Sequence, residues 1–186
     1  MNLDHLHWPT DGWGYMPATE QVFDIFRWIE DGIQPRRLLE FGFHAGHSTS
    51  YQLESFPNSM ITSFGVSREA FEGAHRMNKH YGNRFNFVYK ATTDVLPDLF
   101  VPGMFDLALI DSNHKYSVVA NEIDLVVKWK VPYLLFDNCE WDDVARAITD
   151  RLPQGKLIEE WTYDSSWKGT DSKLIMRLYH VPTNGV

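Results

Sequence analysis

The chain has 186 residues, of which 44% are hydrophobic and 23% charged, and its formal net charge is −8. This length is typical of one domain with one core, so we expect residues 1–186 to form a single domain. The acidic charge balance and the lack of a basic stripe argue against nucleic-acid binding. We expect no signal peptide and no membrane span, and the single cysteine, Cys139, favours a reducing, cytoplasmic location.

Helical and strand periods alternate along the chain. Thr19 is a candidate N-cap for a first helix that ends near Gly32 and Pro35. The apolar stripe of this helix is Val22, Phe23, Phe26 and Ile29. Further helices are expected at 47–56, 69–81, 94–100, 117–129 and 142–151. Strands are expected at 37–41, 60–66, 85–89, 105–110, 133–136, 156–163 and 173–181.

This order of elements predicts the fold class. Strands and helices alternate five times, and near-continuous apolar strands such as 105–110 imply a sheet covered on both faces. The last two strands are joined by DSSWKGTD, whose composition is typical of a hairpin connection. We therefore predict an α/β fold with a doubly wound, mostly parallel seven-stranded sheet and a C-terminal antiparallel hairpin. Ligands of such sheets bind beyond the carboxyl ends of the strands.

The stretch LLEFGFHAGHST, residues 38–49, connects the first strand of the predicted sheet to a helix. Gly42 and Gly46 allow a tight turn and a close approach of a ligand to the main chain. The spacing differs from Gly-x-Gly-x-x-Gly because His44 occupies the middle position. Glu40 suits a cationic or hydroxyl-bearing ligand and would repel a pyrophosphate. The candidate caps of the following helix are His47, Ser48 and Thr49. An ordinary strand-to-helix turn is the alternative interpretation.

Four segments, in the same order as in the family, resemble S-adenosylmethionine (SAM)-dependent methyltransferases of the Rossmann-like class, especially small-molecule O-methyltransferases. They are LLEFGFHAGHST (38–49), ATTDVLPDL (91–99), FDLALIDSNHKY (105–116) and LLFDN (134–138). The resemblance extends over about residues 19–180. It implies a SAM cofactor whose methionine lies beside the glycine loop, with Glu40 near its amino group. The cofactor-binding residues that it implies are Glu40, Gly42, Phe43, His44, Gly46, Ser48, Thr49, Ser67, Thr92, Asp94 and Asp111.

The resemblance to the metal-dependent branch also implies a divalent metal, such as Mg²⁺, held by Asp111, Asp137 and Asn138. Magnesium prefers oxygen ligands, and a bound metal orients an acceptor and lowers the pKa of its hydroxyl. His114 is a candidate base because its ordinary pKa lies near physiological pH. Lys115 is a second candidate, as lysines at the neighbouring position serve in related enzymes. The alternative is that the two aspartates cap the helices that follow them.

Two positions depart from the family's pattern. At the end of the second strand, where the family has an acid for the ribose, Gly65 or Ser67 is found, with Glu69 close by. After the third strand, Thr92 stands where an acid usually faces the adenine, with Asp94 two residues on. These replacements leave two alternatives to a methyltransferase, namely a noncatalytic binding module and another reaction on the same fold.

Aromatic and histidine side chains near the expected site suit a phenolic or sugar acceptor, although each alone could serve packing. They are His5, His7, Trp8, Trp13, Tyr15, Trp141, Trp161 and Trp167. A lid would come from residues 1–18, from 163–171, or from a second subunit of a homo-oligomer. The segment DSNH differs from the Asn/Asp-Pro-Pro-aromatic motif of nucleobase methyltransferases, which argues against DNA and RNA. The sequence thus predicts metal-assisted O-methylation of a small hydroxylated molecule.

Overall fold

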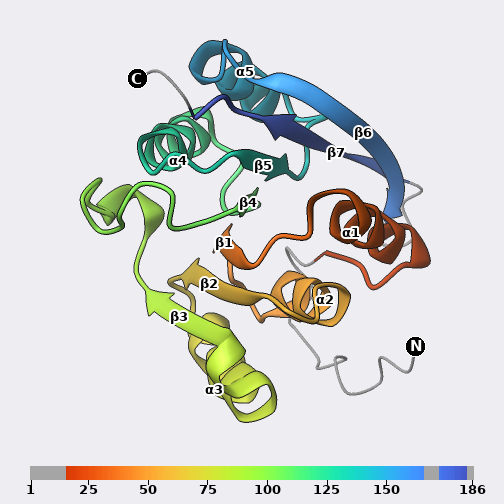
Figure 1. Cartoon of the computed structure of the whole chain (residues 1–186), viewed down its shortest axis with the longest axis vertical. Helices are drawn as coiled ribbons and strands as arrows, with labels where there is room; N and C mark the ends of the chain where they lie inside the picture. The colour runs from red at the N-terminus through yellow and green to blue at the C-terminus, as the bar shows by residue number, and fades with distance from the viewer. Residues whose placement is uncertain (1–15, 166–171, 184–186) are drawn as a thin grey trace.

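The structure, a computed structural model, describes residues 16–165 and 172–183. Its strands are β1 (Arg37–Phe41), β2 (Met60–Gly65), β3 (Phe85–Tyr89), β4 (Leu107–Ile110), β5 (Tyr133–Phe136), β6 (Lys156–Ser165) and β7 (Ser172–His180). They form one sheet in the order β3-β2-β1-β4-β5-β7-β6 (Figure 1). The strands β1 to β5 pair in parallel, whereas β7 is antiparallel to both β5 and β6. The predicted mostly parallel sheet with its terminal hairpin is confirmed.

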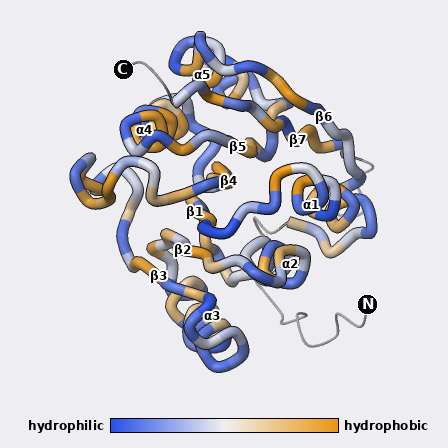
Figure 2. The backbone as a smooth tube through the Cα atoms, in the orientation of Figure 1, coloured by the Kyte–Doolittle hydropathy of each residue, from blue (hydrophilic) through white to orange (hydrophobic). Residues whose placement is uncertain are grey.

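Helices cover both faces of this sheet. They are α1 (Glu20–Ile33), α2 (His47–Ser55), α3 (Arg68–Tyr81), α4 (Tyr116–Lys128) and α5 (Asp142–Arg151), with short 3₁₀ helices η2 (Gly82–Arg84) and η3 (Thr92–Asp94). Because neighbouring residues of a strand point to opposite faces, Leu38 of β1 packs in the core under α1, α2 and α3. Leu39 packs in the second core, under α4 and α5. Figure 2 shows the hydrophobic residues gathered on the central strands.

Local interactions explain where some elements begin and end. Thr19 caps α1 by accepting a hydrogen bond from the Val22 N–H at 3.3 Å, as predicted. Helix α1 ends between Gly32 and Pro35, as predicted, with Gln34 at its C-cap and φ 52°. Strand β4 starts two residues later than expected, since the Asp106 carboxylate accepts hydrogen bonds from the backbone N–H groups of residues 36 and 37.

The predicted helix at 94–100 is wrong. The only helical residues there, among those that the structure describes, belong to η3, whose three residues end at Asp94. Pro97 has no backbone N–H to continue a helix. Its carbonyl instead accepts a hydrogen bond from the indole of Trp129 at 2.7 Å, which ties this connection to the end of α4.

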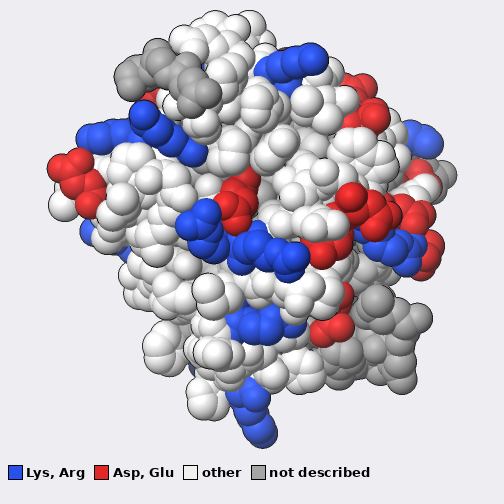
Figure 3. Space-filling model, in the orientation of Figure 1, with Lys and Arg blue, Asp and Glu red and all other residues white. Residues whose placement is uncertain are grey.

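Charges on the visible face of the molecule are mixed. Figure 3 shows Lys and Arg side chains lying among Asp and Glu rather than forming a continuous basic surface on this face. Arg37, for example, pairs with Asp106 at 2.7 Å. Within the described ranges, no helix combines the length and the apolar composition that crossing a membrane requires.

Candidate functional site

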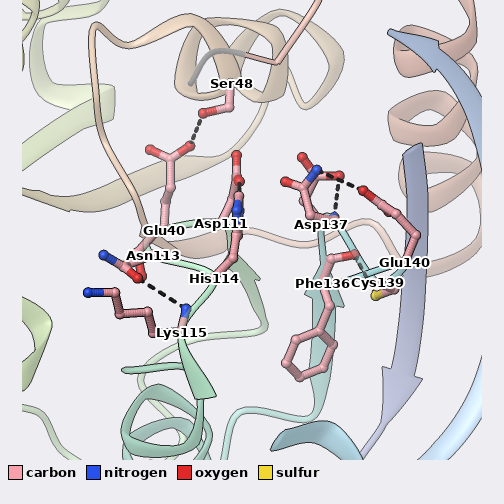
Figure 4. A network of polar contacts seen from close by, with 12 residues as sticks. Glu40, Ser48, Asp111, Asn113, His114, Lys115, Phe136, Asp137, Cys139 and Glu140 are labelled. Atoms are coloured by element: carbon pink, nitrogen blue, oxygen red, sulfur yellow. Dashed lines mark hydrogen bonds and ion pairs between the residues drawn. The ribbon is translucent and has the colours of Figure 1, made fainter. Parts of the chain in front are cut away.

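The carboxyl ends of β1, β4 and β5 bring three loops together. Phe41 pairs with Ile110, and Ile110 pairs with Phe136, so the residues that follow them leave the sheet at the same level. Asp111 donates its backbone N–H to the Phe41 carbonyl at 2.9 Å, and Asp137 donates to the Ile110 carbonyl at 3.2 Å. Figure 4 shows both carboxylates at this edge of the sheet.

The loop after β1 packs directly against the loop after β4. Gly42 has φ +117°, and a Cβ atom built on it would lie 2.0 Å from the carbonyl oxygen of Asp111. Glycine is therefore required at position 42 both by the backbone conformation and by this close approach.

A cavity of about 400 Å³ opens beside this loop. It is lined by Gly42, Phe43, His44, Phe64, Gly65, Val66, Ser67, Lys90, Ala91, Thr92, Thr93, Asp111, Ser112, Asn113 and Val118. We call it the cofactor cavity, after the cofactor that the motifs predict for it. A small recess beside Gly42 and Asp111 adds Gly46 and Ser48 from the start of α2. Most of the predicted cofactor-binding residues thus lie around one space. Three predicted cofactor-binding residues line neither the cavity nor the recess: Glu40, Thr49 and Asp94.

Glu40 is fully buried and faces α2. Its Oε1 accepts hydrogen bonds from Ser48 at 2.6 Å and from the Gln52 amide at 3.0 Å, and its Oε2 accepts one from Thr49 (Figure 4 shows the Ser48 bond). Burial raises the pKa of Glu40, although the hydroxyl donors oppose the shift. The predicted side-chain cap of α2 is wrong, because Gly46 is the N-cap and makes no side-chain capping bond. The candidate caps were His47, Ser48 and Thr49, and the last two hydroxyls bind Glu40 instead.

Two further acids lie near each other: Asp137 is buried, and the side chain of Asp111 is 17% exposed. Asp137 Oδ1 accepts hydrogen bonds from the Tyr163 hydroxyl at 2.6 Å and from the Asn138 N–H at 2.9 Å. Burial and the charge of Asp111 raise the pKa of Asp137 to about 8. Burial also raises the pKa of Asp111, while His114 opposes that shift. Neither aspartate caps a helix, since the N-cap positions of α4 and α5 are Lys115 and Trp141.

His114 lies beside Asp111, with 3.6 Å between Nε2 and the Asp111 Oδ1 atom. Burial alone would lower the pKa of His114. The interaction with Asp111 and the charges of Asp137 and Glu140 outweigh burial and raise that pKa above its usual value. The ring of His114 packs against the Trp141 ring with 4.8 Å between centroids.

A second, more open cavity of about 790 Å³ lies next to His114. It is lined by Ser112, Asn113, His114, Lys115, Glu140, Trp141, Asp142 and Asp143. We call it the acceptor cavity. Ser112 and Asn113 line both cavities, so the two spaces share the wall that follows β4.

A family model described as a methyltransferase domain matches residues 39–139, more than half of the chain, including the loops after β1, β4 and β5. The chain belongs to the methyltransferase domain family. The expectation from the resemblance of its motifs is thereby confirmed at the level of the family. Among curated proteins no sequence matches this methyltransferase.

Solved structures share the fold of the methyltransferase. The N-methyltransferase NodS from Bradyrhizobium japonicum is 18% identical, with a TM-score of 0.65 and 88% of this chain and 95% of that chain covered. The O-methyltransferase TomG from Streptomyces achromogenes, in complex with SAM, is 16% identical, with a TM-score of 0.66 and coverage of 89% and 82%. An O-methyltransferase from Bacillus cereus, in complex with SAH, is 15% identical, with a TM-score of 0.63 and coverage of 88% and 82%.

Of the predicted aromatic surface, the structure of the methyltransferase describes Trp141 and Trp161. Trp141 is 53% exposed and lines the acceptor cavity, whereas Trp161 packs against Trp28 with 5.3 Å between ring centroids. The other predicted residues lie outside the described ranges; they are His5, His7, Trp8, Trp13, Tyr15 and Trp167.

Three side chains at the site were missed by the sequence interpretation. Tyr163 holds Asp137, Ser112 lines both cavities, and Glu122 of α4 accepts hydrogen bonds from the Thr92 and Ser112 hydroxyls. Ser112 lies within the segment that resembles the family and could have been found there. Tyr163 and Glu122 lie in a strand and a helix of ordinary pattern, which gave no signal.

Proposed function

We propose that the protein transfers a methyl group from SAM to an oxygen of a small hydroxylated molecule, with the help of a divalent metal. The observation that carries this proposal is the wall shared by the cofactor and acceptor cavities. Methyl transfer is an in-line displacement, so the donor carbon and the acceptor oxygen must be held next to each other. A shared wall of two residues, Ser112 and Asn113, supports that arrangement.

The cofactor cavity suits the two halves of SAM. The glycine loop, the recess at the start of α2 and Asp111 offer a polar end for the amino acid part. Val66 and Val118 offer apolar surface for the faces of a base. Ser67 and Thr92 supply hydroxyls there in place of acids. Glu40 acts behind this wall, by holding Ser48 in position.

In this proposal, His114 on the wall of the acceptor cavity is the proton acceptor for the reacting oxygen. The acceptor O–H gives its proton to His114, the oxygen forms a bond to the methyl carbon, and the S–CH₃ bond breaks to leave S-adenosylhomocysteine (SAH). His114 must be neutral to accept this proton, and the neighbouring acids favour its charged form. Lys115 is the second candidate base and lines the same cavity. Trp141 offers a flat wall for a phenolic or sugar ring.

The donor set at this edge of the sheet fits a hard divalent cation. Within the described residues, no group of three or more His, Cys, Asp or Glu side chains is arranged to hold a metal, so the set would include the Asn138 amide oxygen. The side-chain nitrogen of Asn138 donates to Glu140 at 3.3 Å, which leaves its oxygen available. Asp111 and Asp137 would supply carboxylates whose mutual repulsion a cation relieves. When bound, the metal would orient the acceptor and lower the pKa of its hydroxyl.

Calorimetric titration with SAM and SAH, with and without MgCl₂, tests the cofactor, and transfer of labelled methyl to phenols and sugars tests the reaction. We expect saturable binding and methyl transfer that EDTA abolishes. Asp137→Asn keeps an acceptor for Tyr163 but removes the charge, and it should lower the metal-dependent rate by roughly 100-fold or more. Asp98→Asn, at an exposed ion pair with Lys128, is the matched control and should leave the rate unchanged.

The outcomes separate the parts of this proposal. An absence of binding up to millimolar SAM and SAH would contradict the methyltransferase reaction and favour a binding module for another ligand. Full activity of Asp137→Asn in EDTA would contradict the role of the metal while leaving methyl transfer intact.

A lid from residues 1–18 or 163–171, or from a second subunit, stays a prediction that size-exclusion chromatography and truncation would address.

A further inference from the structure

Glu122 of α4 forms a buried cluster behind one end of the cofactor cavity. Its side chain is 0% exposed. Its Oε1 accepts a hydrogen bond from Thr92 Oγ1 at 2.6 Å and another from the Ser112 hydroxyl. The other oxygen, Oε2, is buried without a hydrogen-bond partner among the described residues. Asn121, next to Glu122, donates its amide to the Thr92 carbonyl at 3.1 Å. Helix α4 therefore holds Thr92 through both its side chain and its backbone.

This cluster decides which way the two hydroxyls face. Thr92 and Ser112 line the cofactor cavity, and Glu122 lies behind them. A Ser or Thr hydroxyl has one hydrogen and two lone pairs. Because each hydrogen is given to Oε1, both oxygens can act only as acceptors toward a ligand. Oε1 remains an acceptor in the neutral carboxyl as well, when the proton is on Oε2. This end of the cavity thus requires a hydrogen-bond donor from its ligand.

We infer that Glu122 is a specificity-determining residue, which acts through Thr92 and Ser112 to select a 6-amino purine over a 6-oxo purine in the nucleoside cofactor. This inference rests on the proposed function. The exocyclic amine of adenine offers two hydrogens to the hydroxyl oxygens, whereas the 6-oxo group of hypoxanthine offers only lone pairs. Val66 and Val118 line the same cavity and supply partly exposed apolar surface for the faces of a base.

The experiment uses titration calorimetry to compare the Kd of SAH with that of S-inosylhomocysteine, which has a 6-oxo group in place of the 6-amino group and a hydrogen on N1. We expect the unmodified protein to prefer SAH by roughly tenfold or more, because an acceptor facing an acceptor leaves buried polar groups unpaired. Glu122→Met frees both hydroxyls to rotate, so the ratio of the two Kd values should fall toward one. Glu122→Gln keeps a carbonyl oxygen for the hydroxyls and should preserve the preference.

The Kd ratio separates this role from a merely structural one. Loss of stability would weaken both ligands together and leave the ratio unchanged. Thr92→Val removes one acceptor without relying on the Glu122 variants and should also lower the ratio. Thr49→Val is the matched control, since it removes the same kind of hydroxyl–carboxylate bond at Glu40 and should keep the ratio.

Two results would overturn the inference while leaving the proposed function in place. One is equal affinity of the unmodified protein for SAH and S-inosylhomocysteine. The other is an undiminished preference for SAH in both Glu122→Met and Thr92→Val. Failure of the unmodified protein to bind either ligand would instead overturn the proposed function, and this inference with it.

Discussion

The two buried glutamates of the site, Glu40 and Glu122, are similar in surroundings and different in bonding. Both are fully buried, and each accepts hydrogen bonds from a serine and a threonine. Glu40 has donors on both oxygens, with Gln52 as a third. Glu122 has both donors on one oxygen and none on the other among the described residues. A complete set of bonds makes Glu40 an anchor for α2, whereas the incomplete set leaves Glu122 to orient two hydroxyls of the cofactor cavity.

The largest difference between the two acids should appear on their removal. Glu40→Leu leaves the Thr49 hydroxyl and the Gln52 amide without their acceptor in the interior, and the Ser48 hydroxyl without one beside the small recess. At about 1–3 kcal/mol for each stranded group, we expect the free energy of unfolding to fall by about 3–5 kcal/mol. Urea unfolding followed by circular dichroism measures this change.

Glu122→Met is the matched comparison at pH 5. It strands two hydroxyls that can turn toward the cavity and its water, so we expect less than half of the loss caused by Glu40→Leu. Equal losses for the two variants would contradict the division into an anchor and an orienting acid.

The second prediction concerns how the free energy of unfolding depends on pH. Burial raises the pKa of Glu122 from 4.5 to about 7, although the Ser112 and Thr92 hydroxyls oppose the shift. The stability associated with this group is complete below pH 4.5, where both states are protonated, and is lost as pH rises through 7 because the unfolded state ionises first. The shift corresponds to about 3 kcal/mol.

Glu122→Gln isolates this contribution from that of the other acids with raised pKa values, Asp111, Asp137 and Glu40, which act in the same direction. Relative to the unmodified protein, the variant should gain about 3 kcal/mol of stability between pH 4.5 and pH 8. Parallel stability curves for the two proteins over this range would show that Glu122 ionises normally.

The sequence predicted the sheet well because its physical signals are local. Apolar runs such as 105–110 and the turn composition after residue 163 report burial and chain reversal directly. The ends of elements were less predictable when a distant side chain decided them. Trp129 ties the connection at Pro97, where a helix was predicted, and Asp106 binds backbone groups before β1.

In the site, too, the residues placed by local signals were predictable, and those placed by distant contacts were not. Gly42, His44 and Asp111 lie beside one another because they follow paired strands, which the order of motifs implied. The surroundings of the two missing acids could not be found in this way. At Gly65, the last residue of β2, a built Cβ would lie 2.2 Å from the Phe43 carbonyl oxygen, so packing excludes an acid there. After β3, Glu122 reaches Thr92 from α4, thirty residues away, and only tertiary packing brings the two together.

The smallest expected difference concerns the two threonines. Thr49→Val leaves Glu40 Oε2 without its hydroxyl donor, inside a cluster that also includes Ser63 at 3.4 Å from Thr49. Thr92→Val leaves Glu122 Oε1 with Ser112 still bound. We expect unfolding free energies lower by about 2 kcal/mol for Thr49→Val and by less than about 1 kcal/mol for Thr92→Val.

SAH affinity should change in the opposite order, since Thr92 lines the cofactor cavity and Thr49 does not. Thermal unfolding with and without SAH measures both effects on the same samples. If Thr92→Val lost more stability than Thr49→Val and kept its SAH affinity, Glu122 would be the anchor, and the roles of the two acids would have to be exchanged.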